Sequence, residues 1–403
     1  MSAAPIGVGV IGLGRAFTLM LNTFQRDARV RLVAACDPYA AARVQFEKDF
    51  SGQTFETAEA LCAEQNVELI YIASPHQFHA HHVAMAAAHG KHVLLEKPMA
   101  ITLDDCTLAI DAMRAAGLTL IVGPSHSFDA PVLKAREIID SGAVGDVRMI
   151  QALNYTDFLY RPRRADELKT EEGGGVIHSQ AAHQMDIIRL LGGGKLRTVR
   201  ALTGQWDATR STEGAYSALL RFDGGAFANM TYSGSGRFDS DEWMDGLGEL
   251  GVVKATDAYG RARKQLSAIA ASRENEANAK TARNYGGPAY VPAQLPTAHE
   301  HFGPIIVSCD RADLRLTPTG VWVCSDAKRD FVSTPFTGVP RREVIDEVWA
   351  VLREGASGSA GASARGRHDG AWARATTEAC LAILSSARDD CDVALQWQVP
   401  WRR

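Results

Sequence analysis

The sequence is poor in the features that staple a small fold or bind a structural metal. It has seven cysteines among 403 residues, and no two of them have the Cys-x-x-Cys spacing of a metal or redox motif. An odd number of scattered cysteines argues against a disulfide framework and against a structural zinc site. We therefore expect free thiols in a reducing compartment.

Long hydrophobic runs and a strong net charge are also absent. No stretch approaches the roughly 20 apolar residues of a transmembrane helix, and the N-terminal apolar segment lacks the basic flank of a signal peptide. The formal net charge is -4, which is too small to favour nucleic acid or an anionic membrane as partner. These absences predict a cytoplasmic globular protein, and the length allows two or three domains.

What the sequence has is a regular alternation of short apolar runs and amphipathic stretches over its first third. The apolar runs are 6–12, 31–36, 69–74, 92–97 and 118–123, and helical patterns such as 79–90 and 103–117 lie between them. Apolar strands that alternate with helices are typical of a parallel sheet covered on both faces. We predict an α/β fold in which residues 1–125 form a doubly wound Rossmann domain.

The pattern changes after residue 125, where longer runs alternate apolar and polar residues. The runs 147–155, 198–206, 215–222 and 226–234 predict strands, and 131–141, 179–191, 341–353 and 370–388 predict helices. Alternation of this kind suits an antiparallel sheet with one covered face. We therefore expect residues 126–403 to form a second α/β domain with a large, mainly antiparallel open sheet. Its free face predicts a homodimer or homotetramer.

Two segments of this second half break the pattern. Residues 255–300 are polar and read as an insertion, partly helix and partly loop. Residues 355–366 are rich in Gly, Ala and Ser and predict a loop.

A glycine-rich turn follows the first predicted strand. Gly12 and Gly14 lie between that strand and a predicted helix that starts with Arg15 and Ala16. Glycine lets the backbone approach a pyrophosphate, and a helix N-terminus offers free N–H groups to it. The third position of the G-x-G-x-x-G pattern is Phe17, so the motif by itself is weak evidence.

Asp37 ends the second predicted strand, about 23 residues after Gly14. A carboxylate at this position accepts hydrogen bonds from an adenosine ribose and repels a 2′-phosphate, which favours NAD over NADP. Arg43 nearby is a counterweight, because it is able to pair with a phosphate. A helix cap is the alternative role for Asp37.

Two further polar segments follow strands of the predicted parallel sheet. They are Ser74-Pro75-His76 and Glu96-Lys97-Pro98. Ligands of open α/β sheets bind outside the carboxyl ends of the strands. We therefore expect both segments to contact the cofactor, and Lys97 to exchange a proton with a substrate hydroxyl.

In the second half, a triple glycine precedes a helical stretch that carries two histidines. Ser179 and His183 are four residues apart and share a helix face, with His178 at the start of the same stretch. The glycine turn and the second histidine place the start of this helix at an expected cleft. His178, Ser179 and His126 are expected to bind substrate.

Residues 155–164 read YTDFLYRPRR and collect aromatic and basic side chains directly after a predicted strand. Guanidinium groups bind carboxylates in a bidentate way, and aromatic faces cover flat rings. Tyr160, Arg161, Arg163 and Arg164 are therefore expected to bind a planar, carboxylated substrate. The alternative is an ordinary solvated loop.

Taken together, these motifs resemble the Gfo/Idh/MocA family of oxidoreductases. The glycine turn, the Glu-Lys-Pro tripeptide and the Gly-Gly-Gly…His…Asp segment stand in the family's order and spacing over nearly the whole chain, except about 255–300. The resemblance assigns the family's lysine to Lys97 and its histidine to His183, which makes His183 the expected catalytic partner of Lys97. The family's common aspartate, four residues before that histidine, is Ser179 here, and His178 or a substrate carboxylate is a candidate replacement.

These expectations predict an NAD-dependent dehydrogenase that oxidises a ring carbinol, best an aromatic-acid cis-dihydrodiol, without a metal. A sugar or inositol dehydrogenase of the same family is one alternative. A non-catalytic cofactor-binding regulator is another. A metal-dependent hydrolase that uses His79, His81 and His82 is less favoured, because these residues lie on one predicted helix of the Rossmann half.

Overall fold

The computed structural model describes residues 3–255, 258, 260–269, 272–354 and 366–402. Its internal contacts divide the chain into two compact units. The first comprises Met1–Pro124, Asn278–Gln294 and Val339–Arg374, and the second Ser125–Ala277, Leu295–Gly338 and Ala375–Arg403. Residues 355–365 of the expected Gly/Ala/Ser loop lie outside the described residues.

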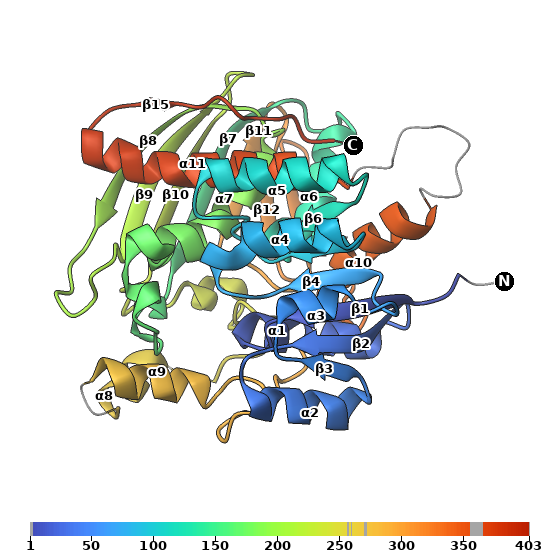
Figure 1. The fold of residues 1–403 in the computed structure, drawn as a ribbon. Helices are drawn as coiled ribbons and strands as arrows, with labels where there is room; N and C mark the ends of the chain where they lie inside the picture. Colours follow the sequence, from blue (N-terminus) through green and yellow to red (C-terminus); the bar gives the residue numbers. More distant parts are fainter. Residues whose placement is uncertain (1–2, 256–257, 259, 270–271, 355–365, 403) are drawn as a thin grey trace. The chain divides into compact units, whose positions relative to one another are not determined.

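The first unit is built on a six-stranded parallel sheet in the order β3-β2-β1-β4-β5-β6 (Figure 1). The strands are β1 Ile6–Ile11, β2 Val30–Cys36, β3 Gln53–Phe55, β4 Leu69–Ile72, β5 His92–Leu95 and β6 Leu120–Val122. The predicted Rossmann sheet is confirmed. β3 was not predicted, since three half-exposed residues carry little pattern.

Helices cover both faces of this sheet, as the apolar strands require. They are α1 Arg15–Arg26, α2 Ala40–Phe50, α3 Ala58–Cys62, α4 His79–Ala88, α5 Leu103–Ala115 and α10 Arg342–Trp349, which a π-helix at Ala350–Glu354 extends. Ile70 and Ile72 of β4 belong to one buried cluster with Val83 of α4 and Met113 of α5. Tyr71, between those isoleucines, instead packs edge-on against Phe24 of α1 at 5.3 Å.

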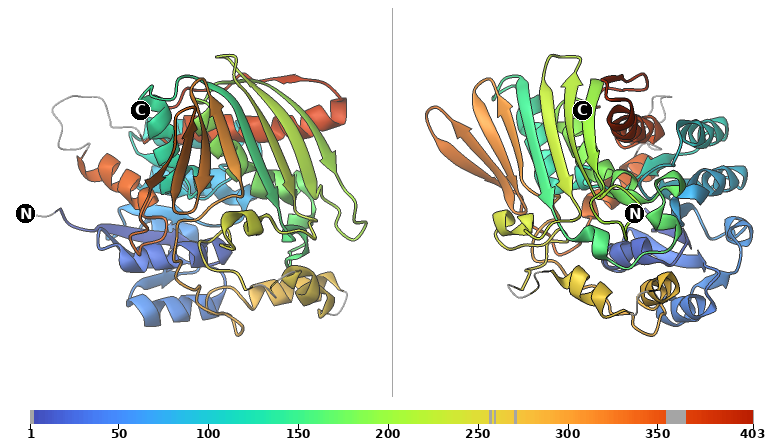
Figure 2. Two further views of the ribbon diagram at one scale, coloured as in Figure 1. Left: turned by 180° about the vertical axis from the view of Figure 1, so that it is seen from behind. Right: turned by 90° about the vertical axis from the view of Figure 1, so that its left-hand side faces the viewer.

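The second unit contains a nine-stranded sheet in the order β14-β13-β12-β11-β7-β10-β9-β8-β15 (Figure 2). The strands are β7 Val147–Tyr155, β8 Leu196–Gly204, β9 Ala215–Phe222, β10 Phe227–Ser233, β11 Ile305–Cys309, β12 Ala312–Thr317, β13 Gly320–Ser325, β14 Arg329–Ser333 and β15 Val393–Ala394. β7 and β10 pair in parallel and the other neighbours are antiparallel. The predicted mainly antiparallel sheet is confirmed.

Helices cover one face of this sheet. In the second unit the structure has α6 Ala130–Asp140, α7 Ala182–Leu191 after a π-helix at Ile177–Ala181, α8 Arg261–Ser267, and parts of α9 Arg273–Thr281 and α11 Gly370–Asp389. Tyr216 of β9 donates a hydrogen bond to Gln184 of α7 at 2.9 Å. Burial alternates along β9, so its other side chains face away from these helices.

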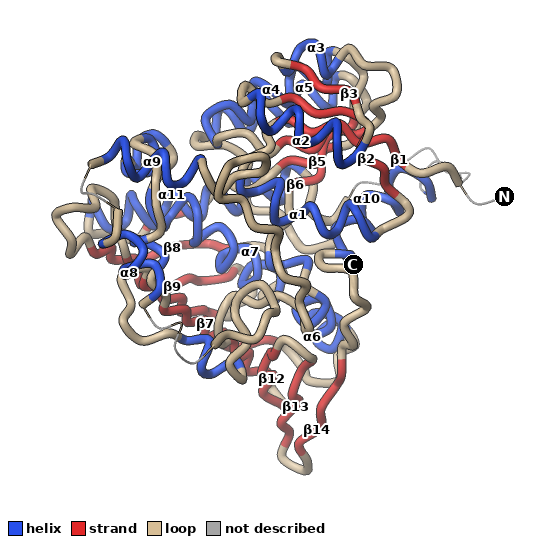
Figure 3. The backbone as a smooth tube through the Cα atoms, turned by 90° about the horizontal axis from the view of Figure 1, so that it is seen from below, coloured by secondary structure: helices blue, strands red, loops and turns tan. Residues whose placement is uncertain are grey.

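Short 3-10 turns that carry site residues follow several of the strands. They are His76–Phe78 in the first unit, and His126–Phe128, Phe158–Tyr160, Asp166–Leu168, Thr170–Glu172 and Ser240–Met244 in the second. Figure 3 shows the strands in red and the helices in blue. No helix among the described residues is both long and apolar enough to cross a membrane.

Candidate active site

The glycine turn of the first unit joins β1 to the start of α1. Gly12 has a φ of +96°, and a Cβ there would lie 2.8 Å from the carbonyl oxygen of Ala73. A Cβ on Gly14 would meet nothing within 4 Å. α1 begins at Arg15 without a side-chain cap and without an acidic residue in its first turn. This uncapped helix N-terminus and its positive dipole end are able to hold the pyrophosphate of a dinucleotide, with Arg15 exposed and Ala16 half-buried beside it.

Asp37 is fixed at the end of β2 by two backbone donors. Its Oδ2 accepts from the Leu13 N–H at 2.7 Å, and its Oδ1 accepts from the Tyr39 N–H at 2.8 Å. Each carboxylate oxygen retains a further lone pair for a ribose hydroxyl. Arg43 donates to the Asp37 backbone carbonyl at 2.8 Å and to Glu56 at 2.8 Å, so its guanidinium is already bound within the protein.

The segments after β4 and β5 are linked by a buried histidine. The ring nitrogens of His79 lie 2.9 Å from the carbonyl oxygens of Ser74 and Pro98. Burial lowers the pKa of His79. The ring thus joins the Ser74-Pro75-His76 turn to the Glu-Lys-Pro turn. It fixes the backbone at Pro98, the residue directly after Lys97.

Glu96, the residue directly before Lys97, is also held in place. It is 7% exposed and accepts a hydrogen bond from the Tyr71 hydroxyl at 2.5 Å. Burial raises the pKa of Glu96, against the opposing charge of Lys97. Lys97 itself is half-buried. Glu96 therefore orients the backbone at Lys97 rather than presenting a charge to the solvent.

In the second unit, histidine and aromatic rings form a cluster. The His126 and His183 rings meet edge to face at 4.7 Å, and Phe302 lies 5.3 Å from the first and 5.2 Å from the second. Tyr232 of β10 stacks on Phe302 at 5.9 Å. The structure thus brings together the two predicted residues His126 and His183. Phe302 packs against both rings, and Tyr232 packs against Phe302.

His126 has a dedicated carboxylate partner. Its Nδ1 lies 2.7 Å from Oδ2 of Asp129, and both side chains are buried. Burial opposes the charged imidazole, but the charge and hydrogen bond of Asp129 prevail and the pKa of His126 is raised. Asp129 therefore orients the His126 ring, which lies against that of His183.

One group of potential metal ligands is present among the described residues. Donor atoms of His126, Asp129 and Glu300 lie within 4.8 Å of one another. The direct His126–Asp129 hydrogen bond already accounts for that pair. The described residues form no such group at His79, His81 and His82, where His79 is held by the carbonyls named above and His82 contacts the Ser74 hydroxyl at 2.9 Å.

The three arginines of the 155–164 segment have different environments. Arg164 is bound bidentately by Asp166 at 2.9 and 3.0 Å. Arg163 lies over the Phe158 ring at 3.9 Å and donates to that residue's carbonyl, and burial lowers its pKa to about 10. Both guanidinium groups are thus committed to partners within the loop. Tyr160 is covered by the guanidinium of Arg263 at 3.5 Å.

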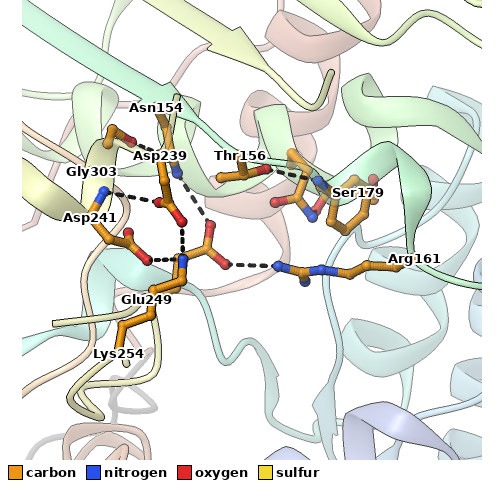
Figure 4. Close-up of polar contacts among 12 residues, drawn as sticks. Asn154, Thr156, Arg161, Ser179, Asp239, Asp241, Glu249, Lys254 and Gly303 are labelled. Carbon is orange, nitrogen blue, oxygen red and sulfur yellow. Dashed lines mark hydrogen bonds and ion pairs between the residues drawn. The ribbon is translucent and has the colours of Figure 1, made fainter. Parts of the chain in front are cut away.

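Arg161 is the exception. Its side chain is 49% exposed, and its ion pair with Glu249 is long, at 3.8 Å (Figure 4). Within the described residues its guanidinium makes no closer polar contact. Glu249 is held in turn by Asn154 at 3.2 Å, so Arg161 is oriented but retains its donors.

The π-helix before α7 carries the remaining predicted residues. Ser179 donates to the carbonyl of Gly175 at 2.5 Å. His178 is buried, and burial lowers its pKa to about 4. Asp186 accepts from Ser127 at 2.5 Å and from Thr376 at 2.9 Å, which makes it a structural anchor of α7.

Sequence reasoning missed Asp129, Phe302, Tyr232 and Glu249 as members of this site. Asp129 had a signal, because it stands three residues after His126 in the same turn. Glu249 had none, since its neighbours in space, Arg161 and Asn154, lie about 90 residues away in the chain.

Comparison with known proteins identifies the family of this chain. Residues 6–124 match the model described as oxidoreductase family, NAD-binding Rossmann fold, and residues 132–254 match the GFO/IDH/MocA C-terminal domain. A curated relative is 43% identical over 95% of this chain and 95% of its own length. The chain belongs to the Gfo/Idh/MocA family of oxidoreductases. That relative is a 1-carboxy-3-chloro-3,4-dihydroxycyclohexa-1,5-diene dehydrogenase of Comamonas testosteroni.

Solved structures extend the comparison. A protein of Bordetella bronchiseptica RB50, assigned provisionally as a dehydrogenase, has a TM-score of 0.88 and 38% identity and covers 97% of this chain and 100% of its own. The WlbA dehydrogenase of Bordetella pertussis, solved with NADH and UDP-GlcNAcA, has a TM-score of 0.69. Its identity is 19%, with 98% of this chain and 99% of its own covered, so it shares the fold. This chain is therefore an NAD(P)-binding dehydrogenase of the Gfo/Idh/MocA family.

Proposed function

We propose that this dehydrogenase uses NAD to oxidise a cyclohexadiene cis-diol that carries a single carboxylate. The observation that carries the proposal is Arg161, whose guanidinium is exposed and only loosely paired while Arg163 and Arg164 are bound within their loop. A buried carboxylate requires a charged partner, because leaving it unpaired costs several kcal/mol. One available guanidinium fits one carboxylate.

Two lines of resemblance support this substrate class. Segments 14–19, 74–77 and 301–309 resemble phthalate 4,5-cis-dihydrodiol dehydrogenase, which would make 4,5-dihydroxyphthalate. The Comamonas relative acts, by its name, on a diene diol with one carboxyl group. Phthalate has two carboxylates, and the single loosely paired arginine favours the monocarboxylated diol.

The proposed reaction is oxidation of one carbinol carbon. NAD, when bound, would supply the acceptor for the hydride that leaves that carbon. Lys97 takes the hydroxyl proton as general base, and His183 donates a hydrogen bond to the developing oxygen charge. The ketone product then tautomerises to an aromatic catechol, which makes the overall step favourable. Gly12, Gly14, Arg15, Ala16 and Asp37 bind and orient the cofactor in this proposal.

Asp37 supports NAD over NADP as the cofactor. A carboxylate fixed at the end of β2 attracts ribose hydroxyls and repels a 2′-phosphate. Arg43, which would have favoured a phosphate, is occupied by Glu56 and by backbone carbonyls.

A sugar or inositol dehydrogenase is the second candidate. Glu249 and Glu300 contribute negative charge around His126, and carboxylates are good acceptors for hydroxyl groups. A non-catalytic regulator is less favoured, because both Lys97 and His183 are retained.

The experiment is a substrate screen with NAD that follows absorbance of the reduced cofactor. It compares monocarboxylated cis-dihydrodiols, phthalate 4,5-cis-dihydrodiol, inositols and aldoses. The proposal requires the highest kcat/KM on a monocarboxylated diol. A preference for a neutral polyol would replace it with the second candidate.

We also propose that this dehydrogenase is a homo-oligomer. Leu219, Phe227 and Ile306 are large apolar residues of β9, β10 and β11 that are 43–44% exposed. Apolar side chains on an open sheet face favour burial against another copy. Light scattering of the protein and of Ile306→Asp tests this, and a wild-type monomer would overturn it.

A further inference from the structure

One part of the insertion joins the first unit. Residues Asn278–Gln294 group with the Rossmann residues by their contacts, and we call this segment the strap. Its central side chain is Tyr285, which is 1% exposed. The Tyr285 ring meets Phe17 of α1 edge-on at 5.2 Å, and its hydroxyl donates to Asp49 of α2 at 2.6 Å. The strap is thus anchored on α1 and α2.

The contact between Tyr285 and Phe17 explains why this chain lacks the third glycine of the G-x-G-x-x-G pattern. Phe17 occupies the third position of that pattern, where glycine is usual. Here the Phe17 ring is fully buried, 6.3 Å from Phe46 of α2, and Tyr285 covers it. The space between α1 and α2 is therefore filled by Phe17 together with a side chain from the strap.

Further contacts hold the strap close to the start of α2. Gly286 has a φ of +73°, and a Cβ there would lie 2.7 Å from the carbonyl oxygen of Ala41. Asn22 of α1 donates to the carbonyl of Ala293 at 3.4 Å. The close approach at Ala41 lies four residues beyond Asp37, the residue expected to bind the ribose.

Tyr290 is a second aromatic residue of the strap that packs against Tyr285. Its half-buried ring lies 5.5 Å from that of Tyr285. Burial and the charge of Asp49 raise the pKa of Tyr290, and the charge of Arg15 opposes this. Tyr290 thus lies beside Tyr285, whose ring packs on Phe17, two residues after Arg15, the exposed residue that directly follows Gly14 and begins α1.

We propose that the strap forms part of the binding site for the adenosine diphosphate half of the cofactor. Tyr290 and Arg15 contact that half, and Tyr285 positions them through Phe17 and Asp49. An aromatic ring and a guanidinium beside the N-terminus of α1 suit a nucleoside diphosphate, which combines a planar base with negative charge. The proposal rests on the cofactor binding of the proposed function and is independent of its substrate.

The test measures binding of ADP-ribose and NADH by calorimetry and by cofactor fluorescence, without substrate. Tyr290→Ala should weaken both ligands roughly 3–10-fold, the usual worth of one aromatic contact, and should leave nicotinamide mononucleotide unaffected. Val291→Ala is the matched control, because Val291 is 78% exposed and next to Tyr290. Unchanged ADP-ribose affinity in a folded Tyr290→Ala protein would overturn the proposal.

Two further variants separate contact from positioning. Arg15→Ala, at an exposed position, should weaken ADP-ribose binding, and its effect should be non-additive with Tyr290→Ala if the two side chains hold the same ligand. Tyr285→Phe keeps the ring and removes only the bond to Asp49. It should weaken ADP-ribose binding less than Tyr290→Ala, and an unchanged affinity would remove Tyr285 from the proposal. A failed substrate assignment would instead appear as normal ADP-ribose binding without turnover of any diol.

Discussion

His126 and Asp129 form a buried ion pair with 2.7 Å between Nδ1 and Oδ2, within a single turn of chain. The pair gives the imidazole a raised pKa, above its usual value near 6.5. Since the folded pKa exceeds the unfolded one, the pair stabilises the fold fully below pH about 6.5 and loses this contribution as pH rises through the folded pKa.

Replacing Asp129 by Asn therefore has a pH-dependent cost. Asp129→Asn should destabilise the protein by about 1–3 kcal/mol at pH 6 and by clearly less at pH 9. Chemical unfolding at the two pH values measures this. Asp111→Asn, which breaks an exposed pair with Arg114, is the control and should cost less than about 1 kcal/mol. An equal loss at pH 6 and pH 9 would show that His126 is not charged in the fold.

Replacing Asp241 should increase stability relative to the wild type as the pH rises. Burial and the nearby charge of Glu249 raise the pKa of Asp241 to about 7. The wild type therefore loses stability as pH rises from about 4, the usual aspartate pKa, through 7, where the buried carboxyl ionises. Asp241→Asn removes this loss, so its stability relative to wild type should be greater at pH 8 than at pH 5. Thermal unfolding at both pH values checks this, and the same difference at both would contradict it.

Asp37 is expected to set the cofactor preference. Asp37→Ser should shift the ratio of kcat/KM values toward NADP by about tenfold or more, because the carboxylate that repels a 2′-phosphate is removed. The N–H groups of Leu13 and Tyr39 lose acceptors in this variant. Asp37→Asn, which retains one acceptor oxygen, is the matched comparison. A wild type that already prefers NADP tenfold would refute this role.

Lys97 is expected to be the general base. Lys97→Ala should leave the NADH dissociation constant nearly unchanged and lower kcat by roughly 10²–10⁴. His183→Ala should also lower kcat, by less if His178 or Ser179 shares its role. Lys48→Ala, at an exposed position of α2, is the control. Wild-type turnover in the Lys97 variant would remove that residue from the chemistry.

Arg161 is expected to recognise the substrate carboxylate. Arg161→Ala should raise KM at least tenfold for a carboxylated diol and little for a neutral polyol, because the charged partner of a desolvated carboxylate is lost. Arg164→Ala is the matched control, since its guanidinium is bound by Asp166. Equal KM changes in both variants would mean that the loop acts through its folding rather than through one arginine.

The helices and strands with a strong hydrophobic periodicity were predicted from the sequence. β7 and β9 have the predicted bounds, and α4, α5 and α6 begin within one residue of them. β11 to β14 were not predicted. They are short, and charged residues such as Arg315 and Asp330 interrupt their apolar pattern, so each depends on its neighbour for stability.

The candidate site was predictable in its residue types but not in its partners. Three arginines in one loop are equivalent in the sequence. They differ in the structure because Arg164 meets Asp166 in the same loop, and Arg161 meets Glu249 from a distant segment. The partner of Phe17 was also not predictable. Phe17 replaces the third glycine of the motif, and Tyr285, which packs against it, lies 268 residues later in the chain.

The position of β7 has a consequence for biosynthesis. β7 pairs with β10 on one side and with β11 on the other. Both partners are made long after it, and β11 ends only at Cys309. During translation, β7 therefore leaves the ribosome with two unsatisfied edges, which favour aggregation until the later strands arrive. A chain truncated before residue 305 should accumulate in inclusion bodies, and chaperone demand should fall once the ribosome has passed β11.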